Sequence, residues 1–148
     1  MDCNLYQYLS KNKLSPSLKI NGKKYPYDIK NGYMQISKKW NKNDQLNIYL
    51  PMEVNTVVSN DLVTYNRGKV ALEYGPLVYA VEETDNKNGF DDLQLSENEK
   101  FKVFFDKNLL GGINTISNKK IKAIPYYSWS NRGVGKMKVW IDYNSPTK

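Results

Sequence analysis

The stretch VALEYGPLVYAV, residues Val70–Val81, decides the fold class of this 148-residue chain. It contains two strand-like segments, 70–74 and 77–81, joined by Gly75-Pro76, a pair typical of a tight turn. The second segment is an unbroken apolar run, which favours a central strand covered on both faces. We therefore expect this hairpin to lie at the heart of an all-β core.

The rest of the chain shows the same strand pattern. Its apolar residues alternate with a period of two and are interrupted roughly every ten residues by Gly, Asn, Asp or Pro. Asn21-Gly22 and Asn31-Gly32 suit the positive φ values of tight hairpin turns. In residues 45–50 the apolar side chains alternate with polar ones, as in a strand with one wet face. No segment shows a convincing helical period, so the sequence predicts a β-sandwich or a barrel, and of the two we expect a jelly-roll-like sandwich.

A polar stretch, Ser59-Asn60-Asp61, is the best candidate for a domain boundary. We expect residues 1–60 to form a partial first β-sandwich and residues 61–148 to form a second one. Within the second, residues 101–105 resume strand character after an acidic loop, Gly111-Gly112 predicts a turn, and residues 137–141 predict a closing strand.

The chemistry open to the chain is limited, because it has no histidine and a single cysteine, Cys3. A Ser-His-Asp triad, histidine acid–base catalysis and the usual His/Cys zinc site are therefore excluded. Cys3 cannot form an internal disulfide and has no histidine to activate it, so we expect it to be incidental. The sequence predicts no catalytic residue, no metal site and no cofactor.

Five carboxylates form the one dense acidic group: Glu82, Glu83, Asp85, Asp91 and Asp92. Two of them could serve as a glycosidase pair, which needs two carboxylates, or several could ligate calcium. The spacing matches no calcium loop, and a solvated turn between strands is the reading we favour.

The net charge of +7 raises nucleic acid as a partner. Among the 22 basic residues, however, only Arg67 and Arg132 are arginines, and the lysines are dispersed along the chain. Base recognition depends largely on arginine forks, so nucleic-acid binding through the lysine face is the least favoured binding hypothesis. Residues 1–9 do not resemble a signal peptide, and no apolar run approaches the ~20 residues of a membrane helix. We expect a soluble chain with no membrane partner, and its localisation stays open.

The segment from Tyr126 to Arg132 is the most distinctive candidate for binding. Tyr126, Tyr127 and Trp129 provide flat rings, and Asn131 and Arg132 provide planar hydrogen-bonding groups, which together suit a sugar-binding surface. If the segment is a strand, Tyr127 and Trp129 share one face. The alternative is that the rings pack in the core or against another domain while Arg132 bridges to a carboxylate.

Residues 69–82, 123–133 and 137–141 together resemble the C-terminal part of glycoside hydrolase family 127, the β-L-arabinofuranosidase family. The hairpin corner Gly75-Pro76-Leu77-Val78-Tyr79 and the segment 125–133 carry the likeness, which extends over about residues 18–141. The resemblance implies a helical-barrel catalytic domain followed by two β-sandwiches, with the matched motifs in the sandwiches. The implied catalytic residues, a zinc-held cysteine and a glutamate, belong to the barrel and have no counterpart here.

The resemblance thus predicts a non-catalytic accessory or structural domain, with a free-standing carbohydrate-binding module as the alternative. The two differ in ring exposure, because a binding module presents its aromatic residues on an open face. Residues 1–17 lack the Arg-Ile-Pro-x-Trp strand usual in the family, so we expect an incomplete first sandwich. Its open edges and apolar surface would favour a homo-oligomer, a catalytic-domain partner or a rearranged N-terminus.

Overall fold

The computed structural model describes residues 4–9 and 14–144, so Cys3 lies outside the described residues. These residues form fifteen strands and three single-turn 3₁₀ helices, η1 (Thr64–Asn66), η2 (Glu83–Asp85) and η3 (Tyr126–Ser128). The expected all-β class is confirmed. Within these residues no helix has the length and apolar character needed to cross a membrane.

The chain divides into two compact units between Met52 and Glu53. The small unit spans residues 12–52, and the large unit combines residues 53–148 with the start of the chain. The predicted boundary near residue 60 differs from this division. Residues 59–61 instead enter the connection between two paired strands, β7 (Val54–Ser59) and β8 (Lys69–Tyr74). The polar residues serve a turn here, because the Asn60 side chain accepts a hydrogen bond from the Leu62 backbone N–H at 2.9 Å.

The large unit also takes in the N-terminal strand. β1 (Tyr6–Tyr8) pairs antiparallel with β7, with Tyr6 opposite Ser59. The expected first sandwich of residues 1–60 is therefore shared between two units, because long-range pairing recruits both of its ends into the large unit.

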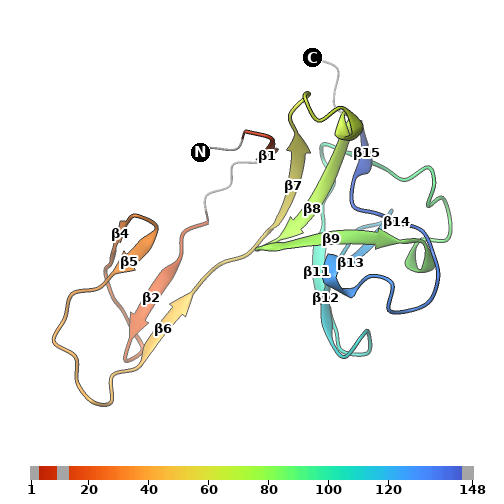
Figure 1. Cartoon of the computed structure of the whole chain (residues 1–148). Coiled ribbons are helices and arrows are strands. Elements are labelled where there is room, and N and C mark those ends of the chain that lie inside the picture. The colour runs from red at the N-terminus through yellow and green to blue at the C-terminus, as the bar shows by residue number, and fades with distance from the viewer. Residues whose placement is uncertain (1–3, 10–13, 145–148) are drawn as a thin grey trace. The chain divides into compact units, whose positions relative to one another are not determined.

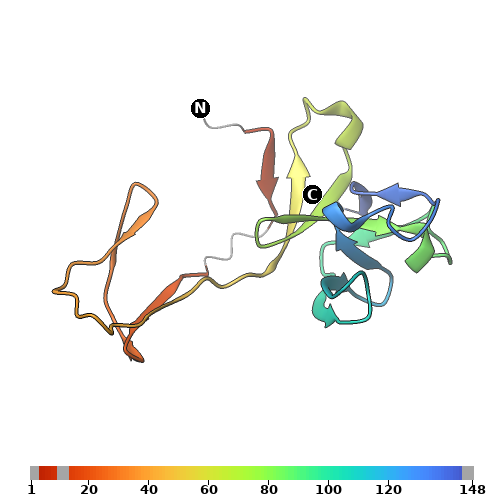
Figure 2. The same cartoon turned by 60° about the horizontal axis from the view of Figure 1, so that its bottom comes forward.

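The small unit contains two short sheets (Figure 2). One has the order β3-β2-β6, with β2 at Ser17–Ile20, β3 at Lys23–Lys24 and β6 at Leu46–Tyr49. The other pairs β4 (Asp28–Lys30) with β5 (Tyr33–Gln35). The two predicted turns are confirmed: Asn21 and Gly22 have φ of 52° and 77°, and Asn31 and Gly32 have φ of 51° and 81°.

Burial in the small unit is limited. Leu18 and Ile20 of β2 are buried, but Leu46 and Ile48, which lie opposite them on β6, are 43% and 49% exposed. The predicted strand is therefore present, but its predicted apolar face is not covered. β6 forms an edge of its sheet, and no further layer packs on these side chains within the described residues.

The large unit is one branched hydrogen-bonded sheet (Figure 1). Its main path is β1-β7-β8-β9-β13-β12-β11, with β9 at Leu77–Glu82, β13 at Lys122–Pro125, β12 at Ile113–Ser117 and β11 at Lys102–Asp106. Off this path, β14 (Met137–Lys138) pairs with β9, while β15 (Ile141–Asn144) pairs with β8 and with β10 (Gln94–Ser96). The single closing strand predicted for residues 137–141 is thus two short strands, because β9 and β8 each pair with a different part of it.

The core of the large unit lies on the hairpin of β8 and β9. Tyr79, Ala80 and Val81 of β9 are at most 1% exposed, which confirms a strand covered on both faces over this part. Leu77 and Val78, next to the turn, are each 38% exposed, so the cover begins at Tyr79. Around them the core gathers residues from the whole unit: Val70, Leu72, Phe90, Leu93, Leu95, Ile116, Ile121, Ala123 and Ile141.

Candidate functional site

The aromatic segment, for which the sequence left a strand open, is a turn. Pro125 ends β13 with φ −54° and ψ 136°, and the chain then forms η3, in which the Trp129 backbone N–H donates to the Tyr126 carbonyl at 3.2 Å. Proline has no N–H for a sheet ladder, so a strand ends readily here. The condition under which Tyr127 and Trp129 would share a face is therefore not met. Tyr126 and Trp129 are the neighbours, with ring centroids 6.5 Å apart and planes inclined by 35°.

The three rings lie at the surface of the large unit. Tyr126 is 47% exposed, Tyr127 65% and Trp129 37%, whereas Ser128 between them is 4% exposed. Packing of these rings in the core is therefore not observed. A small hollow of about 30 Å³ lies beside Trp129 and Arg132, which is room for about two water molecules and not for a sugar ring.

Arg132 holds this segment to the end of β9. Its guanidinium donates to both carboxylate oxygens of Asp85, Nη1 to Oδ1 at 2.9 Å and Nη2 to Oδ2 at 2.5 Å, and it also donates to Glu82. The hydrogen bonds that Arg132 donates to Asp85 and Glu82 raise the pKa of Arg132 above its usual value, against the opposing effect of burial. The side chains are largely buried, with Arg132 19% and Glu82 8% exposed. The bridge to a carboxylate that the sequence offered as an alternative is therefore what Arg132 makes.

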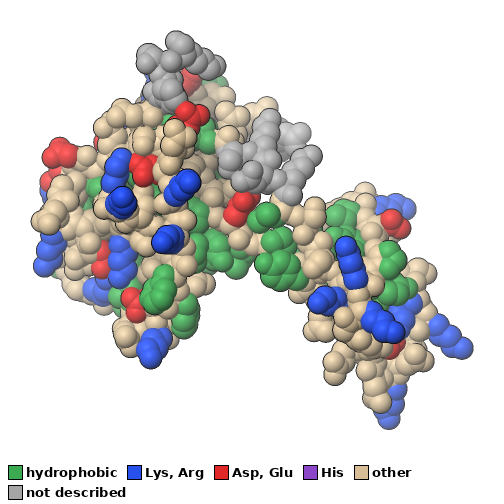
Figure 3. Space-filling model, turned by 180° about the vertical axis from the view of Figure 1, so that it is seen from behind, with side chains coloured by type: hydrophobic (Ala, Val, Ile, Leu, Met, Phe, Trp, Pro, Cys, Tyr) green, Lys and Arg blue, Asp and Glu red, His purple; other side chains and the backbone are tan. Residues whose placement is uncertain are grey.

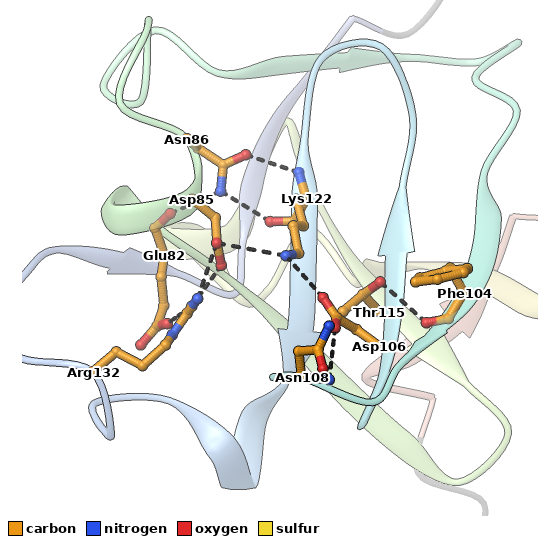
Figure 4. A network of polar contacts seen from close by, with 9 residues as sticks. All are labelled: Glu82, Asp85, Asn86, Phe104, Asp106, Asn108, Thr115, Lys122 and Arg132. Carbon is orange, nitrogen blue, oxygen red and sulfur yellow. Dashed lines mark hydrogen bonds and ion pairs between the residues drawn. The ribbon is translucent and has the colours of Figure 1, made fainter. Parts of the chain in front are cut away.

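The ion pairs continue into a network across three strands. Figure 4 shows Asp85 between the guanidinium of Arg132 and the ammonium of Lys122, with Asp106 of β11 on the far side of Lys122. Lys122 Nζ lies 3.7 Å from a carboxylate oxygen of each aspartate. Glu82 in addition accepts a hydrogen bond from the Ser130 backbone N–H at 2.7 Å. The network ties the aromatic turn to β9, β13 and β11.

Asn131 also has a structural task. Its side-chain amide donates to the backbone carbonyls of Ser128 and Trp129 at 3.2 Å and 3.3 Å. Of the five candidate residues, the structure thus engages Asn131 and Arg132 in internal contacts and leaves Tyr126 and Tyr127 as the most open surfaces. The network arises because the turn at residues 83–85 brings Asp85 beside Glu82. From the sequence, Glu82 and Asp85 belonged to one acidic loop. Only their separation by three positions at the end of a strand indicated that one cation could bind both carboxylates.

The remaining acidic residues do not converge. Glu83 accepts a hydrogen bond from the Lys136 backbone N–H at 3.1 Å, and Asp91 forms an exposed ion pair with the Lys136 side chain at 2.9 Å. Within residues 4–9 and 14–144 no three Asp, Glu, Cys or His side chains group in a way that could hold a metal ion. Glu83 and Asp91 therefore serve a hydrogen bond and an ion pair inside the unit.

Comparison with protein families assigns both units. Residues 54–142 match the glycoside hydrolase family 127 C-terminal domain, and residues 9–52 match the β-L-arabinofuranosidase GH127 middle domain. The chain belongs to glycoside hydrolase family 127. The junction of the two family 127 matches coincides with the division between the compact units at Met52 and Glu53.

Individual family 127 proteins agree with this assignment. A non-reducing end β-L-arabinofuranosidase of Bifidobacterium longum subsp. longum is 26% identical over 85% of this chain. A solved GH127 β-arabinofuranosidase is 31% identical over 97% of the chain with a TM-score of 0.86. A GH127 β-L-arabinofuranosidase from Geobacillus stearothermophilus T6 is 32% identical over 88% with a TM-score of 0.79. The chain spans about a quarter of the length of these proteins, namely 24%, 26% and 25%.

Proposed function

We propose that this chain is a non-catalytic, structural β-sandwich region of a β-L-arabinofuranosidase-like family 127 glycoside hydrolase. The observation that carries the proposal is that the two matches, to a middle and a C-terminal domain, together span residues 9–142. Three quarters of each relative lies outside the matched region, which leaves ample chain for a separate catalytic domain.

The side chains support this proposal. The sequence has no histidine and one cysteine, so a His-based or Cys-His catalytic pair cannot be assembled. Glu82 and Asp85, the carboxylates closest to the aromatic turn, both bind Arg132. Glycoside hydrolysis by two carboxylates needs one that donates a proton and one that attacks or activates water. Paired with one always-charged guanidinium, neither is placed for such a role.

Hydrolysis of a chromogenic aryl β-L-arabinofuranoside tests the lack of activity. We expect the purified 148-residue chain to release no more aglycone than buffer, while the complete Bifidobacterium relative, assayed in parallel, turns the substrate over. Release that increases with chain concentration and co-elutes with the chain on gel filtration would overturn the proposal.

The small unit supports a docking role within such an enzyme. Hydrophobic surface is visible on both units (Figure 3). Eight large apolar side chains in residues 29–52 are at least 43% exposed: Ile29, Tyr33, Trp40, Leu46, Ile48, Tyr49, Leu50 and Met52. Leu46, Ile48, Leu50 and Met52 follow one another along one short stretch of the chain, and apolar side chains gathered on a surface mark protein contacts. We assign these side chains to packing against the catalytic portion of a family 127 enzyme.

Light scattering during gel filtration tests this assignment on the isolated chain. With its partner surface absent, the chain should self-associate, and the double substitution Ile48→Lys and Leu50→Lys should return it to a monomer. The double substitution Asn41→Lys and Asn43→Lys, at exposed polar positions of the same unit, adds the same charge and should leave self-association unchanged. A parent chain that stays monomeric at every concentration would argue against the docking role.

A second candidate function, a carbohydrate-binding module, is favoured by the exposure of Tyr126 and Tyr127. Open aromatic faces are what stacking against a sugar ring requires. Titration with a β-L-arabinofuranosyl oligosaccharide, followed by Trp fluorescence, tests it. Binding should be lost in Tyr127→Ala and kept in Tyr65→Ala, since Tyr65 is 90% exposed elsewhere on the unit. No saturable change in the parent would dismiss this candidate.

A further inference from the structure

A polar cleft of about 490 Å³ lies in the large unit, away from the aromatic rings. One wall is the segment Thr84–Asn88 that follows β9, and the other is Ser117–Lys122, the connection between β12 and β13. The volume falls in the range of ~300–1,000 Å³ that is typical of small-molecule sites. The cleft is thus large enough for a short oligosaccharide.

The base of the cleft is fixed by Asn86, which is 8% exposed. Its amide nitrogen donates to the Lys122 carbonyl at 2.9 Å and to the Glu82 carbonyl at 2.7 Å, and its oxygen accepts from the Lys122 backbone N–H at 2.8 Å (Figure 4). One side chain therefore joins both walls. Such a preorganised base lowers the entropic cost of ligand binding.

The second wall is held just as firmly. The Asn118 side-chain oxygen accepts hydrogen bonds from the backbone N–H groups of Lys120 and Ile121 at 2.8 Å and 2.9 Å. Its amide nitrogen donates to Glu99 at 2.9 Å. The turn that carries the lysines is therefore ordered by its own side chain, and the lysine positions are set before any ligand arrives.

The lining carries an excess of positive charge. Four lysines and one aspartate line the cleft, a net charge of +3. Lys122 is paired with Asp85 and Asp106, and Lys120 with Glu99. Lys87 and Lys119 are exposed and make no ion pair within the part of the chain that the structure describes. These two ammonium groups are available to an anion.

Neutral hydrogen-bonding groups accompany the charges. The side chains of Thr84, Asn88 and Ser117 line the cleft and make no hydrogen bond to the other described residues. Hydroxyl and amide groups both donate and accept, as sugar hydroxyls require of a partner. No arginine lines the cleft, so the bidentate fork that favours phosphate recognition is missing from the described lining.

From this combination we propose that the cleft binds an acidic oligosaccharide, with sugar carboxylates at Lys87 and Lys119 and sugar hydroxyls at Thr84, Asn88 and Ser117. The inference is independent of the proposed support role, because it concerns a surface of the large unit that the docking argument does not use. No aromatic ring lines the cleft, so binding should depend on charge and weaken as salt rises.

Titration of the ¹⁵N-labelled full chain with trigalacturonate, monitored by amide chemical shifts, tests the proposal. We expect saturable shifts in residues 84–88 and 117–122. The double variant Lys87→Gln and Lys119→Gln should bind about tenfold more weakly, because it lacks the two ammonium groups that would pair with the sugar carboxylates. The matched variant Lys23→Gln and Lys24→Gln, in the small unit, removes the same charge and should bind as the parent does. Both variants change exposed lysines only, so their melting curves should match that of the parent chain.

Titrations with three further ligands test which class of anion the cleft binds. Fully methyl-esterified trigalacturonate should bind at least about tenfold more weakly, since it keeps the hydroxyls and loses the charges. Tripolyphosphate or a single-stranded oligonucleotide binding as tightly as trigalacturonate would overturn the saccharide assignment and indicate an unselective cationic surface. Absence of shifts with trigalacturonate at millimolar concentration, or shifts equal in both lysine variants, would overturn the site.

Discussion

Arg132 and Asp85 are 47 residues apart in the sequence, yet their side chains meet through two parallel hydrogen bonds at 2.9 Å and 2.5 Å. The pair fastens the aromatic turn to the end of β9, and it shares Asp85 with Lys122 of β13. A planar guanidinium with a bidentate carboxylate is both directional and strong. The arrangement explains why residues at the surface of the large unit keep a defined conformation.

Replacing Arg132 should destabilise the large unit. Arg132→Ala leaves the largely buried Glu82 without its ion-pair partner and Asp85 with only the more distant Lys122, and we expect a loss of about 2 kcal/mol in the free energy of unfolding. Urea denaturation followed by Trp fluorescence measures it. The control is Arg67→Ala, because Arg67 is the other arginine and donates from the surface to the Asp61 carbonyl. A loss for Arg132→Ala no larger than that of the control would contradict the role of the network.

Asn86 should contribute more to the free energy of unfolding than Asn88 does. Asn86→Ala removes three hydrogen bonds of 2.7–2.9 Å and leaves buried backbone groups of Glu82 and Lys122 without partners. We expect a cost of about 2–3 kcal/mol. Asn88→Ala, at an exposed position in the same segment, should cost less than about 0.5 kcal/mol in the same denaturation experiment. Equal costs would show that the bridge between the two walls contributes nothing.

Stability should fall in strong alkali because of Tyr79. Burial, with smaller effects of Tyr127 and Tyr74, raises the pKa of Tyr79 from 10.0 to about 12. The unfolded chain then loses this proton more readily than the folded chain does. The contribution is therefore fully present below pH 10 and is lost as pH rises through 12, by up to about 2–3 kcal/mol.

Denaturation curves at a series of alkaline pH values measure this loss. Tyr79→Phe cannot ionise and should make the decline between pH 10 and pH 12 shallower than in the parent. The same change at the 90% exposed Tyr65 should leave the decline as it is. A decline of the same steepness in Tyr79→Phe and in the parent would mean that other groups cause it.

Amide hydrogen exchange should separate the two units. The small unit buries only Leu18 and Ile20 among its described apolar side chains, whereas the large unit has a core of eleven residues. Few buried contacts leave backbone hydrogen bonds open to local unfolding. We expect mass spectrometry to show residues 17–49 exchanging before β8, β9 and β13. Protection of β2 and β6 equal to that of β9 would refute this order.

Local sequence was sufficient for the turns and for most strands. Asn21-Gly22 and Asn31-Gly32 adopt the predicted positive φ values because these residue types tolerate them wherever the chain places them. Alternation likewise located β6, but it could not show whether Leu46 and Ile48 would be covered. Cover depends on a second layer, which is supplied by residues far away in sequence or in another chain.

The division of the chain near residue 53 and the turn at residues 126–128 could not be read from local sequence, for a related reason. A polar stretch looks alike in a linker and in the connection between β7 and β8, and only pairing of Val54 with Tyr74 distinguishes them. The spacing of the rings in the aromatic segment does not show that the strand ends at Pro125. It also does not show that Arg132 forms ion pairs with Glu82 and Asp85.

By itself the sequence determined the all-β class, the family resemblance and the lack of any histidine-based chemistry, because these depend on composition and on short-range patterns. The tertiary structure alone decided which carboxylates neutralise Arg132, which rings stay open, and that Lys87 and Lys119 come to line one cleft. Those outcomes require segments such as 84–88 and 117–122 to be brought together. Only the long-range pairing of β9 with β13, within a packed core, does so.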